Sequence, residues 1–234
     1  MIVSNIVKGF HFKNAQEAFE YFYRCILSHG FYSEDQHTKA LFNVGFYIND
    51  PKDRDIKTNW RKWNKKYAER EWKWYLSQNR SVEEIKKFAP TWDKMHNGDN
   101  IVNSNYGWQW GRNNQLDKCI EQLKKDKSTR QAWISIFDGK EKDMYQFDTP
   151  CTLAVGFYVL PVDELKLNMT VTMRSNDLVY GFCNDQYCFS NLQELVANEL
   201  GMEVGEYYHF AQNLHIYEKH FNMKEKYGLR KEIQ

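Results

Sequence analysis

Three polar segments interrupt the apolar patterning of this sequence, and each carries side chains that could do chemistry. They are NSNYGWQW at 103–110, DTPCT at 148–152 and MRSNDLVYGFCND at 173–185. Cys151 follows a proline at the start of an apolar run, a position that can present a thiol to a cleft. Arg174 and Ser175 could bind a phosphate group through charge-assisted hydrogen bonds. The sequence thus indicates a nucleophile and an anion site where strands end.

The same residues also have ordinary structural interpretations. An isolated cysteine is most often buried and inert, and an arginine at a strand end most often pairs with a surface carboxylate. His209, His215 and His220 are six and five residues apart, a spacing that no common zinc motif uses. The five cysteines form no C-x-x-C pair, so they indicate neither a zinc site nor a disulfide framework. No metal is expected.

The composition limits the classes of partner. Among 234 residues, Lys and Arg (32) balance Asp and Glu (31), so the net charge of +1 gives no basic field for a nucleic acid polymer. No apolar stretch approaches the roughly 18 residues of a membrane span, and the N-terminus lacks a signal-peptide pattern. Aromatic residues make up 16% of the chain, which favours stacking sites for flat ligands. We expect a soluble cytoplasmic protein without membrane or nucleic acid partners.

Hydrophobic periodicity indicates the elements that must position these side chains. Apolar residues at helical spacing predict helices at 15–27, 59–76, 116–125 and 191–200. Ser190 and Gln193 have capping-box spacing for the last helix. Apolar runs and period-two patterns predict strands at 132–137, 152–160 and 165–173. With helices clustered early and strands in the middle, the chain is expected to form one α+β domain over 1–234.

The order and spacing of several motifs resemble those of the thymidylate synthase family. The main motifs are P-C-x-x-x-x-x-F-Y-V at 150–159, R-S-x-D-x-x-x-G at 174–181 and H-x-Y at 215–217. Further similarities are E-x-x-W-Y-L at 71–76, W-D at 92–93, Y-G-x-Q-W at 106–110 and S-T-R-Q at 128–131. The resemblance extends over about residues 15–223. It implies a central mixed β-sheet with flanking helices and a homodimer formed through the sheet.

The resemblance implies a role for each matched side chain. Cys151 is the expected nucleophile, which adds to C6 of a pyrimidine nucleotide. Glu71 corresponds to the acid that works through ordered water. Arg174 and Ser175 are expected to bind the nucleotide phosphate, and Arg130 is expected to reach the phosphate of the neighbouring subunit.

The remaining matched residues are expected around the sugar, the base and the folate. His215 and Tyr217 correspond to the pair that contacts the sugar hydroxyl, and Tyr106 to a further substrate-binding residue. Asp177 corresponds to an aspartate on the base and folate side, and Trp92 and Trp110 to tryptophans near folate and nucleotide. The resemblance also implies 5,10-methylenetetrahydrofolate as one-carbon donor. Without the motifs, these tryptophans would be interpreted as core.

Two departures from the synthase pattern indicate which base is bound. Thr152 follows Cys151 where a synthase has histidine, and F-C-N-D at 182–185 stands where a synthase has L-P-F-N. Counting from the R-S motif without a gap, Asp185 takes the place of the base-reading asparagine. A carboxyl group can accept from the N4 amino group of cytosine and, when protonated, donate to N3. A register shift of one residue would instead place Asn184 there and favour uracil.

Within the family, this pattern is similar to the deoxycytidylate hydroxymethylases of bacteriophages. It implies that water captures the exocyclic methylene to give 5-hydroxymethyl-dCMP and tetrahydrofolate. The polar tail at 228–234, GLRKEIQ, favours this outcome over reductive methylation of dCMP or dUMP, which releases dihydrofolate. A non-catalytic nucleotide-binding subunit is a third interpretation, against which the intact set of Cys151, Arg174 and His215 argues.

Overall fold

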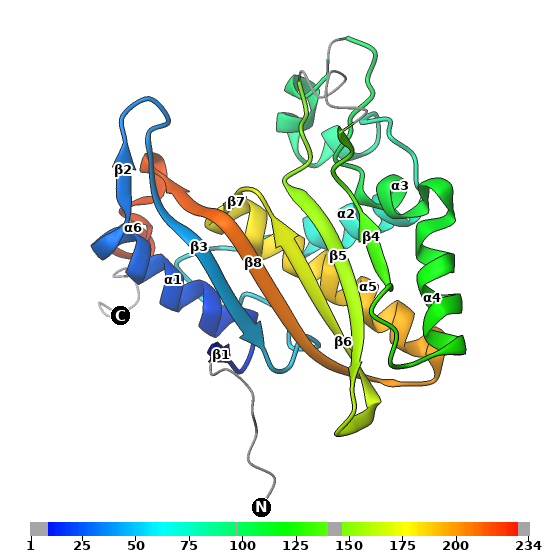
Figure 1. Cartoon of the computed structure of the whole chain (residues 1–234). Helices are drawn as coiled ribbons and strands as arrows, with labels where there is room; N and C mark the ends of the chain where they lie inside the picture. The colour runs from blue at the N-terminus through cyan, green and yellow to red at the C-terminus, as the bar shows by residue number, and fades with distance from the viewer. Residues whose placement is uncertain (1–8, 97, 140–146, 229–234) are drawn as a thin grey trace, which may run out of the picture.

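A mixed β-sheet forms the centre of the computed structural model, which describes residues 9–96, 98–139 and 147–228 (Figure 1). The strands follow the order β1-β3-β8-β6-β5-β4, with β2 paired to β3 and β7 to β8. The strand bounds are β1 Phe10–Phe12, β2 Phe31–Ser33, β3 Thr38–Ile48, β4 Trp133–Ser135, β5 Thr152–Leu160, β6 Asp163–Met173, β7 Asn176–Asp177 and β8 Glu203–Tyr217. β8 is antiparallel to β3 and parallel to β6, so the predicted mixed sheet is confirmed.

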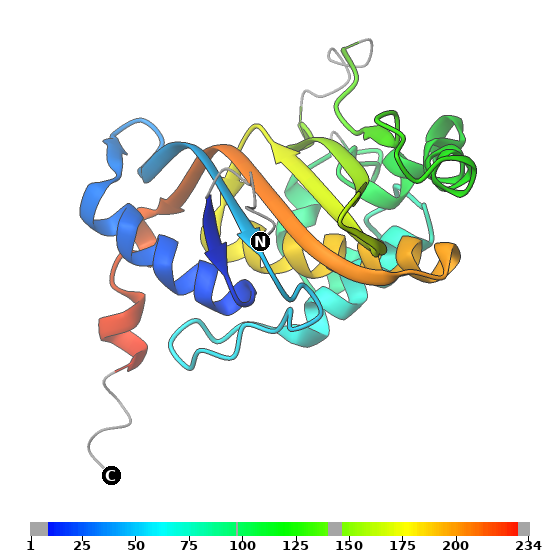
Figure 2. The same cartoon turned by 60° about the horizontal axis from the view of Figure 1, so that its bottom comes forward.

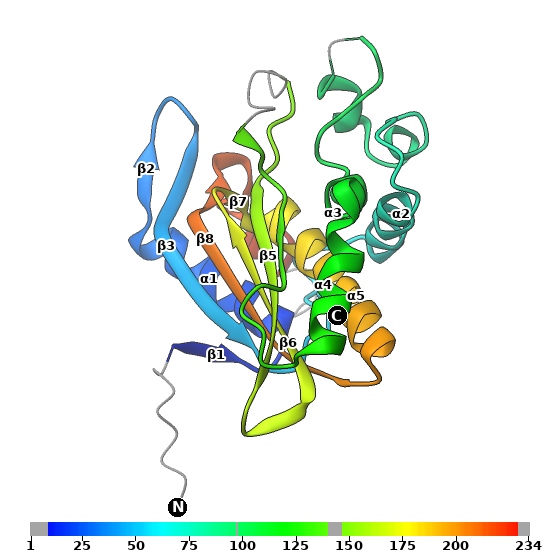
Figure 3. The same cartoon turned by 45° about the vertical axis from the view of Figure 1, so that its right-hand side comes forward.

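Helices cover one face of this sheet. Figure 2 shows α1 and α5 beneath the sheet with α2 beyond α5, and Figure 3 shows α2, α3, α4 and α5 together on one side. The helix bounds are α1 Ala15–His29, α2 Lys65–Leu76, α3 Tyr106–Gly111, α4 Gln115–Lys125, α5 Cys183–Leu200 and α6 Met223–Gly228. The architecture therefore has two layers, helices and sheet, with the core between them.

The alternation along β6 shows why only one sheet face belongs to this core. Leu167, Met169, Val171 and Met173 are fully buried beneath the helices. Thr170 lies between them, faces the other way and is half-buried. Successive side chains of a strand point to opposite faces, and burying each large apolar side chain contributes roughly 1.5–3 kcal/mol.

Two predicted helices begin at other residues than the sequence pattern indicates. α2 begins at Lys65 instead of 59, because Lys62 has a left-handed φ of 50° and the Asn64 side chain caps the helix by accepting from Tyr67 N. α5 begins at Cys183 instead of 191, so the predicted capping box was wrong and Ser190 is buried inside the helix.

The true start of the α5 region is Asp177. Its carboxylate accepts from Val179 N and Tyr180 N, which begins a π-helical turn over Leu178–Phe182 that continues into α5. β4 is shorter than the predicted strand at 132–137, and the structure adds β3 and β8, which no sequence pattern predicted. The polar tail after Gly228, from which capture of the methylene by water was predicted, lies outside the described residues.

None of the helices in the described part of the chain is long and apolar enough to cross a membrane. Within residues 9–96, 98–139 and 147–228, no three or more His, Cys, Asp or Glu side chains are grouped so as to hold a metal ion.

Candidate active site

A cavity of about 1480 Å³ brings together most of the side chains that the sequence singled out. It extends from the ends of β7 and β8 across to α2 and the segment before α3. The predicted site residues that line it are Glu71, Trp92, Tyr106, Cys151, Arg174, Ser175, Asp177, Asn184, Asp185, His215 and Tyr217. Residues separated by more than a hundred positions in the sequence thus share one concave surface, as expected of a ligand site.

Asp148 joins two of the three polar segments. Its buried carboxylate accepts from Asn103 N at 2.7 Å and from the backbone N and Oγ of Ser104 at 2.6 and 2.5 Å. The Asn103 side chain returns a bond to the carbonyl of Asp148 at 3.0 Å. Nearby, Thr152 N donates to the Tyr106 hydroxyl at 3.4 Å. These bonds fix the peptide that carries Cys151 before β5 begins.

Cys151 lies beside the guanidinium of Arg174. Nη2 of Arg174 is 3.8 Å from Sγ and also donates to the carbonyl of Thr149 at 2.8 Å, while Nε donates to the carbonyl of Pro150 at 3.0 Å. Burial raises the pKa of the Cys151 thiol to about 11, and the positive charge of Arg174 opposes that rise. The thiol is therefore protonated at neutral pH in the free protein, with Arg174 as the neighbouring group that favours the thiolate.

Glu71 sits in a hydrogen-bonded row with two aromatic side chains. Trp92 Nε1 donates to the Tyr67 hydroxyl at 2.9 Å, and that hydroxyl donates to Glu71 Oε1 at 2.7 Å. Oε2 is buried and has no hydrogen-bond partner among the described residues. Burial raises the pKa of Glu71 to about 7, although the bond from Tyr67 opposes this. A carboxyl group with this pKa can exchange a proton near neutral pH.

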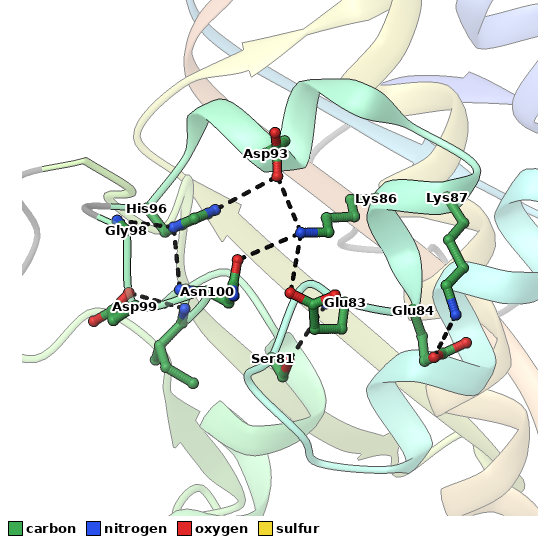
Figure 4. Close-up of polar contacts among 11 residues, drawn as sticks. Ser81, Glu83, Glu84, Lys86, Lys87, Asp93, His96, Gly98, Asp99 and Asn100 are labelled. Carbon is green, nitrogen blue, oxygen red and sulfur yellow. Dashed lines mark hydrogen bonds and ion pairs between the residues drawn. The ribbon is translucent and has the colours of Figure 1, made fainter.

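Trp92 lies on the 3-10 turn Pro90–Lys94. Polar contacts around Lys86 and Asp93 hold this segment (Figure 4). The ammonium of Lys86 contacts Glu83 Oε1 at 3.0 Å and Asp93 Oδ1 at 3.2 Å. This contact with Lys86 lowers the pKa of Asp93. The aspartate of the W-D pair therefore ties the segment together and is not one of the residues that line the cavity.

Asp185 and Asn184 differ in what their side chains already bind. Asn184 Oδ1 accepts from Trp63 Nε1 at 2.9 Å, and its Nδ2 donates to the carbonyl of Tyr180 at 2.9 Å. Asp185 Oδ2 accepts from Asn176 Nδ2 at 2.8 Å, whereas Oδ1 has no hydrogen bond within the described part of the chain. The depth of Asp185 in the protein raises the pKa of its carboxyl group well above the ordinary value.

The predicted sugar-binding residues lie at the end of β8. His215 pairs in register with Asp177 of β7, and its Nδ1 is 3.0 Å from Asn213 Oδ1. The Tyr217 ring meets the His215 ring edge to face at 5.2 Å, and Tyr217 is 38% exposed and lines the cavity. Asp177 already accepts from two backbone amides, and burial raises the pKa of its carboxyl group.

Two predicted site residues lie outside the cavity. Trp110, expected near folate and nucleotide, is 2% exposed and packs in the core against Trp72 and Tyr75, with ring centroids at 6.0 and 5.9 Å. Arg130 is exposed in the turn between α4 and β4. Neither residue lines the cavity of its own chain.

The sequence analysis placed none of Tyr67, Asn176 and His209 at the site, although each binds a predicted site residue or its partner. The helical i,i+4 spacing of Tyr67 and Glu71 could have revealed the first. Asn176 lies inside the R-S-x-D motif at its variable position. His209 comes from β8, whose pairing with β6 and β7 is not readable from local sequence.

Known proteins resemble this chain in sequence and in fold. The family model described as Thymidylate synthase matches residues 17–233. Thymidylate synthase 1 of Bacillus spizizenii is 29% identical over 169 residues, which cover 68% of this chain and 59% of that protein. Deoxycytidylate 5-hydroxymethyltransferase of Enterobacteria phage T4 is 29% identical over 175 residues, which cover 68% of this chain and 69% of that protein.

A solved structure gives the same result for the fold. Thermostable thymidylate synthase A from Bacillus subtilis superposes with a TM-score of 0.73 at 22% identity, covering 92% of this chain and 84% of that chain. The predicted fold class is thereby confirmed. The matched region spans 59% of the length of the Bacillus spizizenii synthase. Since the family model extends over nearly all of the sequence, the chain belongs to the thymidylate synthase family.

Proposed function

We propose that this protein is a deoxycytidylate 5-hydroxymethyltransferase, which converts dCMP to 5-hydroxymethyl-dCMP. The observation that carries the proposal is Asp185, a carboxyl group in the cavity wall at the position where the synthase motif has asparagine. Its Oδ1 has no hydrogen bond within the described residues, whereas both ends of the Asn184 amide are engaged. This difference supports Asp185 and not Asn184 as the group that reads the base.

A carboxyl group at this position suits cytosine better than uracil. Cytosine presents an amino donor at N4 and an acceptor at N3, and uracil presents the reverse. A raised pKa makes the neutral acid available to Asp185, so one oxygen can accept while the other donates. A site built around specific hydrogen bonds rejects the mismatched analogue strongly, by about 10⁴-fold in favourable cases.

The cavity also fits the cosubstrate that the family uses. Its volume of about 1480 Å³ exceeds the roughly 300–1,000 Å³ of a pocket for one small ligand. Its wall on the α2 side is aromatic, with Trp63, Phe88 and Trp92 among the lining residues, and rings of this kind stack on flat ligands. When bound there, 5,10-methylenetetrahydrofolate would supply the one-carbon unit.

Different side chains of this protein would perform the separate steps of the reaction. Cys151, as thiolate, would add to C6 of the pyrimidine and thereby make C5 nucleophilic. Arg174, 3.8 Å from the sulfur, favours that thiolate, and with Ser175 it is the proposed phosphate ligand. Glu71 would orient and deprotonate the water that captures the methylene, because Oε2 is unpartnered and the pKa is about 7.

Reductive methyl transfer is the alternative, and synthases of Bacillus are as similar to this chain as the phage hydroxymethyltransferase is. The two reactions differ in the folate they release. We would incubate the purified protein with 5,10-methylenetetrahydrofolate and dCMP and follow dihydrofolate by absorbance, with nucleotide consumption measured in parallel. Consumption without dihydrofolate supports hydroxymethyl transfer, and stoichiometric dihydrofolate would contradict it.

We propose that two copies of the chain pair through the sheet face opposite the helices of the described residues. Alternation along the strands places Tyr158, Tyr208 and Phe210 on this face, and the Trp133 ring lies over Gly156, where a Cβ would come within 2.7 Å of it. Arg130 is exposed and outside its own cavity, which supports a role at the partner's phosphate site.

Mixing two inactive variants tests this pairing. Cys151→Ser removes the nucleophile, and Arg130→Ala removes the proposed shared ligand. In a mixed dimer, one site would keep both Cys151 and the partner's Arg130. Activity should therefore return after subunit exchange between the two variants, and a mixture that stays inactive despite exchange would refute a shared site.

A further inference from the structure

We propose that a one-way row of hydrogen bonds from Tyr207 through His209 to Asn176 fixes the polarity of the Asp185 carboxyl group and so sets base selectivity. Tyr207, His209 and Asn176 are positioning residues, because each acts through the next. The inference rests on the proposed function, since it explains how Asp185 would distinguish the two pyrimidines. None of the three was expected at the site from the synthase motifs.

The row is continuous and buried. The Tyr207 hydroxyl is 2.9 Å from His209 Nδ1, and His209 Nε2 is 3.1 Å from Asn176 Oδ1. Asn176 Nδ2 then donates to Asp185 Oδ2 at 2.8 Å. Tyr207 and His209 are 0% exposed and Asn176 is 2% exposed, so water does not compete for the bonds among these three residues. The row ends at the cavity, which both Asn176 and Asp185 line.

The direction of the row follows from the state of His209. Its ring packs against Phe46 and Phe182, with ring centroids 5.2 Å from each, and burial lowers its pKa to about 3. The imidazole is therefore neutral at neutral pH, with one nitrogen that donates and one that accepts.

Only one of the two tautomers leaves every proton in the row with an acceptor. The Tyr207 hydroxyl has no other partner in the described part of the protein, so if Nδ1 donated to it, a buried hydroxyl proton would be stranded. With Nδ1 as acceptor, Nε2–H donates to Asn176 Oδ1. The amide of Asn176 is thereby oriented with Nδ2 towards Asp185, and every donor in the row points to the carboxyl group.

This polarity has a consequence for the base. A neutral carboxyl group with a free choice of protonated oxygen could match the donor and acceptor order of either cytosine or uracil. Because Oδ2 must accept from Asn176, the proton of the neutral acid is confined to Oδ1. The raised pKa of Asp185 makes this neutral form relevant. The row therefore removes one of the two proton arrangements. In the proposed complex Oδ1 faces N3 of the base and Oδ2 faces the substituent at C4, so the arrangement that remains matches cytosine and not uracil.

Gly181 packs tightly against the Asn176–Asp185 hydrogen bond at the end of the row. A Cβ at this position would lie 2.8 Å from Asn176 Nδ2 and 3.2 Å from Asp185 Oδ2. Any larger residue would press on both partners of the final hydrogen bond. The absence of a side chain at Gly181 thus leaves room for the pair.

The test compares the kcat/KM values for dCMP and dUMP in variants at His209. His209→Phe removes the donor and frees the Asn176 amide to rotate, so the dCMP/dUMP ratio should fall about fivefold or more, the equivalent of one net hydrogen bond. His209→Gln keeps an amide N–H that can donate to Asn176, so it should retain most of the selectivity. An unchanged ratio in His209→Phe would overturn the proposal.

A matched control separates selectivity from loss of stability. Gln193 is buried on α5 outside the cavity, and its Nε2 donates to the carbonyls of Leu167 and Gly205 at 2.9 and 3.2 Å. Gln193→Leu should lower the melting temperature without changing the dCMP/dUMP ratio. A fall in ratio as large as in His209→Phe would contradict a specific role for the row. If His209→Phe does not fold, Asn176→Ala breaks the row at its last bond.

The failure of the proposed function would remain distinguishable. If the natural protein forms no 5-hydroxymethyl-dCMP, that function is wrong. In that case the melting-temperature shifts that dCMP and dUMP produce measure nucleotide binding, and the difference between the two shifts tests whether the row sets base selectivity. That difference should shrink in His209→Phe and persist in His209→Gln, and any other pattern would refute the row as a selector.

Discussion

Replacing Glu71 with glutamine should stabilise the free protein at alkaline pH, because Glu71 is a buried acid whose ionisation destabilises the folded state. Glu71 is 5% exposed, Oε2 has no partner among the described residues, and burial raises its pKa to about 7 from an ordinary 4.5. Ionising this group therefore costs free energy in the folded state that is not spent in the unfolded chain.

The size and sign of the effect follow from the two pKa values. Below the pKa of the unfolded chain, Glu71 is protonated in both the folded and the unfolded state, so it does not lower the free energy of unfolding. As pH rises through the window from 4.5 to about 7, the unfolded chain ionises first, so stability falls. Above about pH 7 the penalty levels off at roughly 3 kcal/mol, since each unit of pKa difference is about 1.4 kcal/mol.

Glutamine has no carboxyl group to ionise, so Glu71→Gln lacks this penalty. The stability difference between variant and natural protein should grow by roughly 2 kcal/mol between about pH 5.5 and about pH 9. Urea unfolding at fixed protein concentration measures it, with Glu69→Gln, which removes an exposed carboxylate from the same helix, as control. A difference that does not change with pH, or one that Glu69→Gln reproduces, would refute the reasoning.

Three further predictions concern the cavity. Cys151→Ser should abolish turnover while dCMP still raises the melting temperature, and undiminished turnover would remove the covalent mechanism. Asp185→Ala should bring the dCMP/dUMP ratio of kcat/KM close to one, whereas Asn184→Ala should not; the opposite result would mean that Asn184 reads the base. Arg174→Ala should slow alkylation of Cys151 by iodoacetamide at about pH 8, because loss of the neighbouring positive charge raises the thiol pKa further. Peptide mass mapping measures that rate, and an equal rate would show that Arg174 does not act on the sulfur.

Local sequence patterns predicted elements whose two faces differ strongly. α1 begins at the predicted residue, Ala15, where the Asn14 side chain caps the helix by accepting from Glu17 N, and β5 has the predicted bounds. The sequence pattern did not predict β8, because Tyr208 and Phe210 alternate with the buried Tyr207 and His209. Both faces of the strand therefore look apolar or aromatic in sequence. In β3, Asn43 has a left-handed φ of 55° that interrupts the two-residue period.

The site was predictable where motifs fix a residue type, and not where side chains act through others. Cys151, Arg174 and Asp185 line the same cavity, as the motif order implied. Trp110 has a motif match but packs into the core, because the α3 face that carries it turns towards Trp72 and Tyr75. His209 reaches the site only through the pairing of β8 with β6 and β7, a long-range contact that no local pattern encodes.

The proposed function requires the protein to convert dCMP, and not dUMP, to a 5-hydroxymethyl nucleotide. Its most direct test is to incubate the protein with 5,10-methylenetetrahydrofolate and equal amounts of dCMP and dUMP, and to identify the nucleotide products by mass spectrometry. We predict 5-hydroxymethyl-dCMP as the product, with dUMP left unchanged. Formation of thymidylate from dUMP, or of 5-methyl-dCMP, would contradict a hydroxymethyl transfer to dCMP.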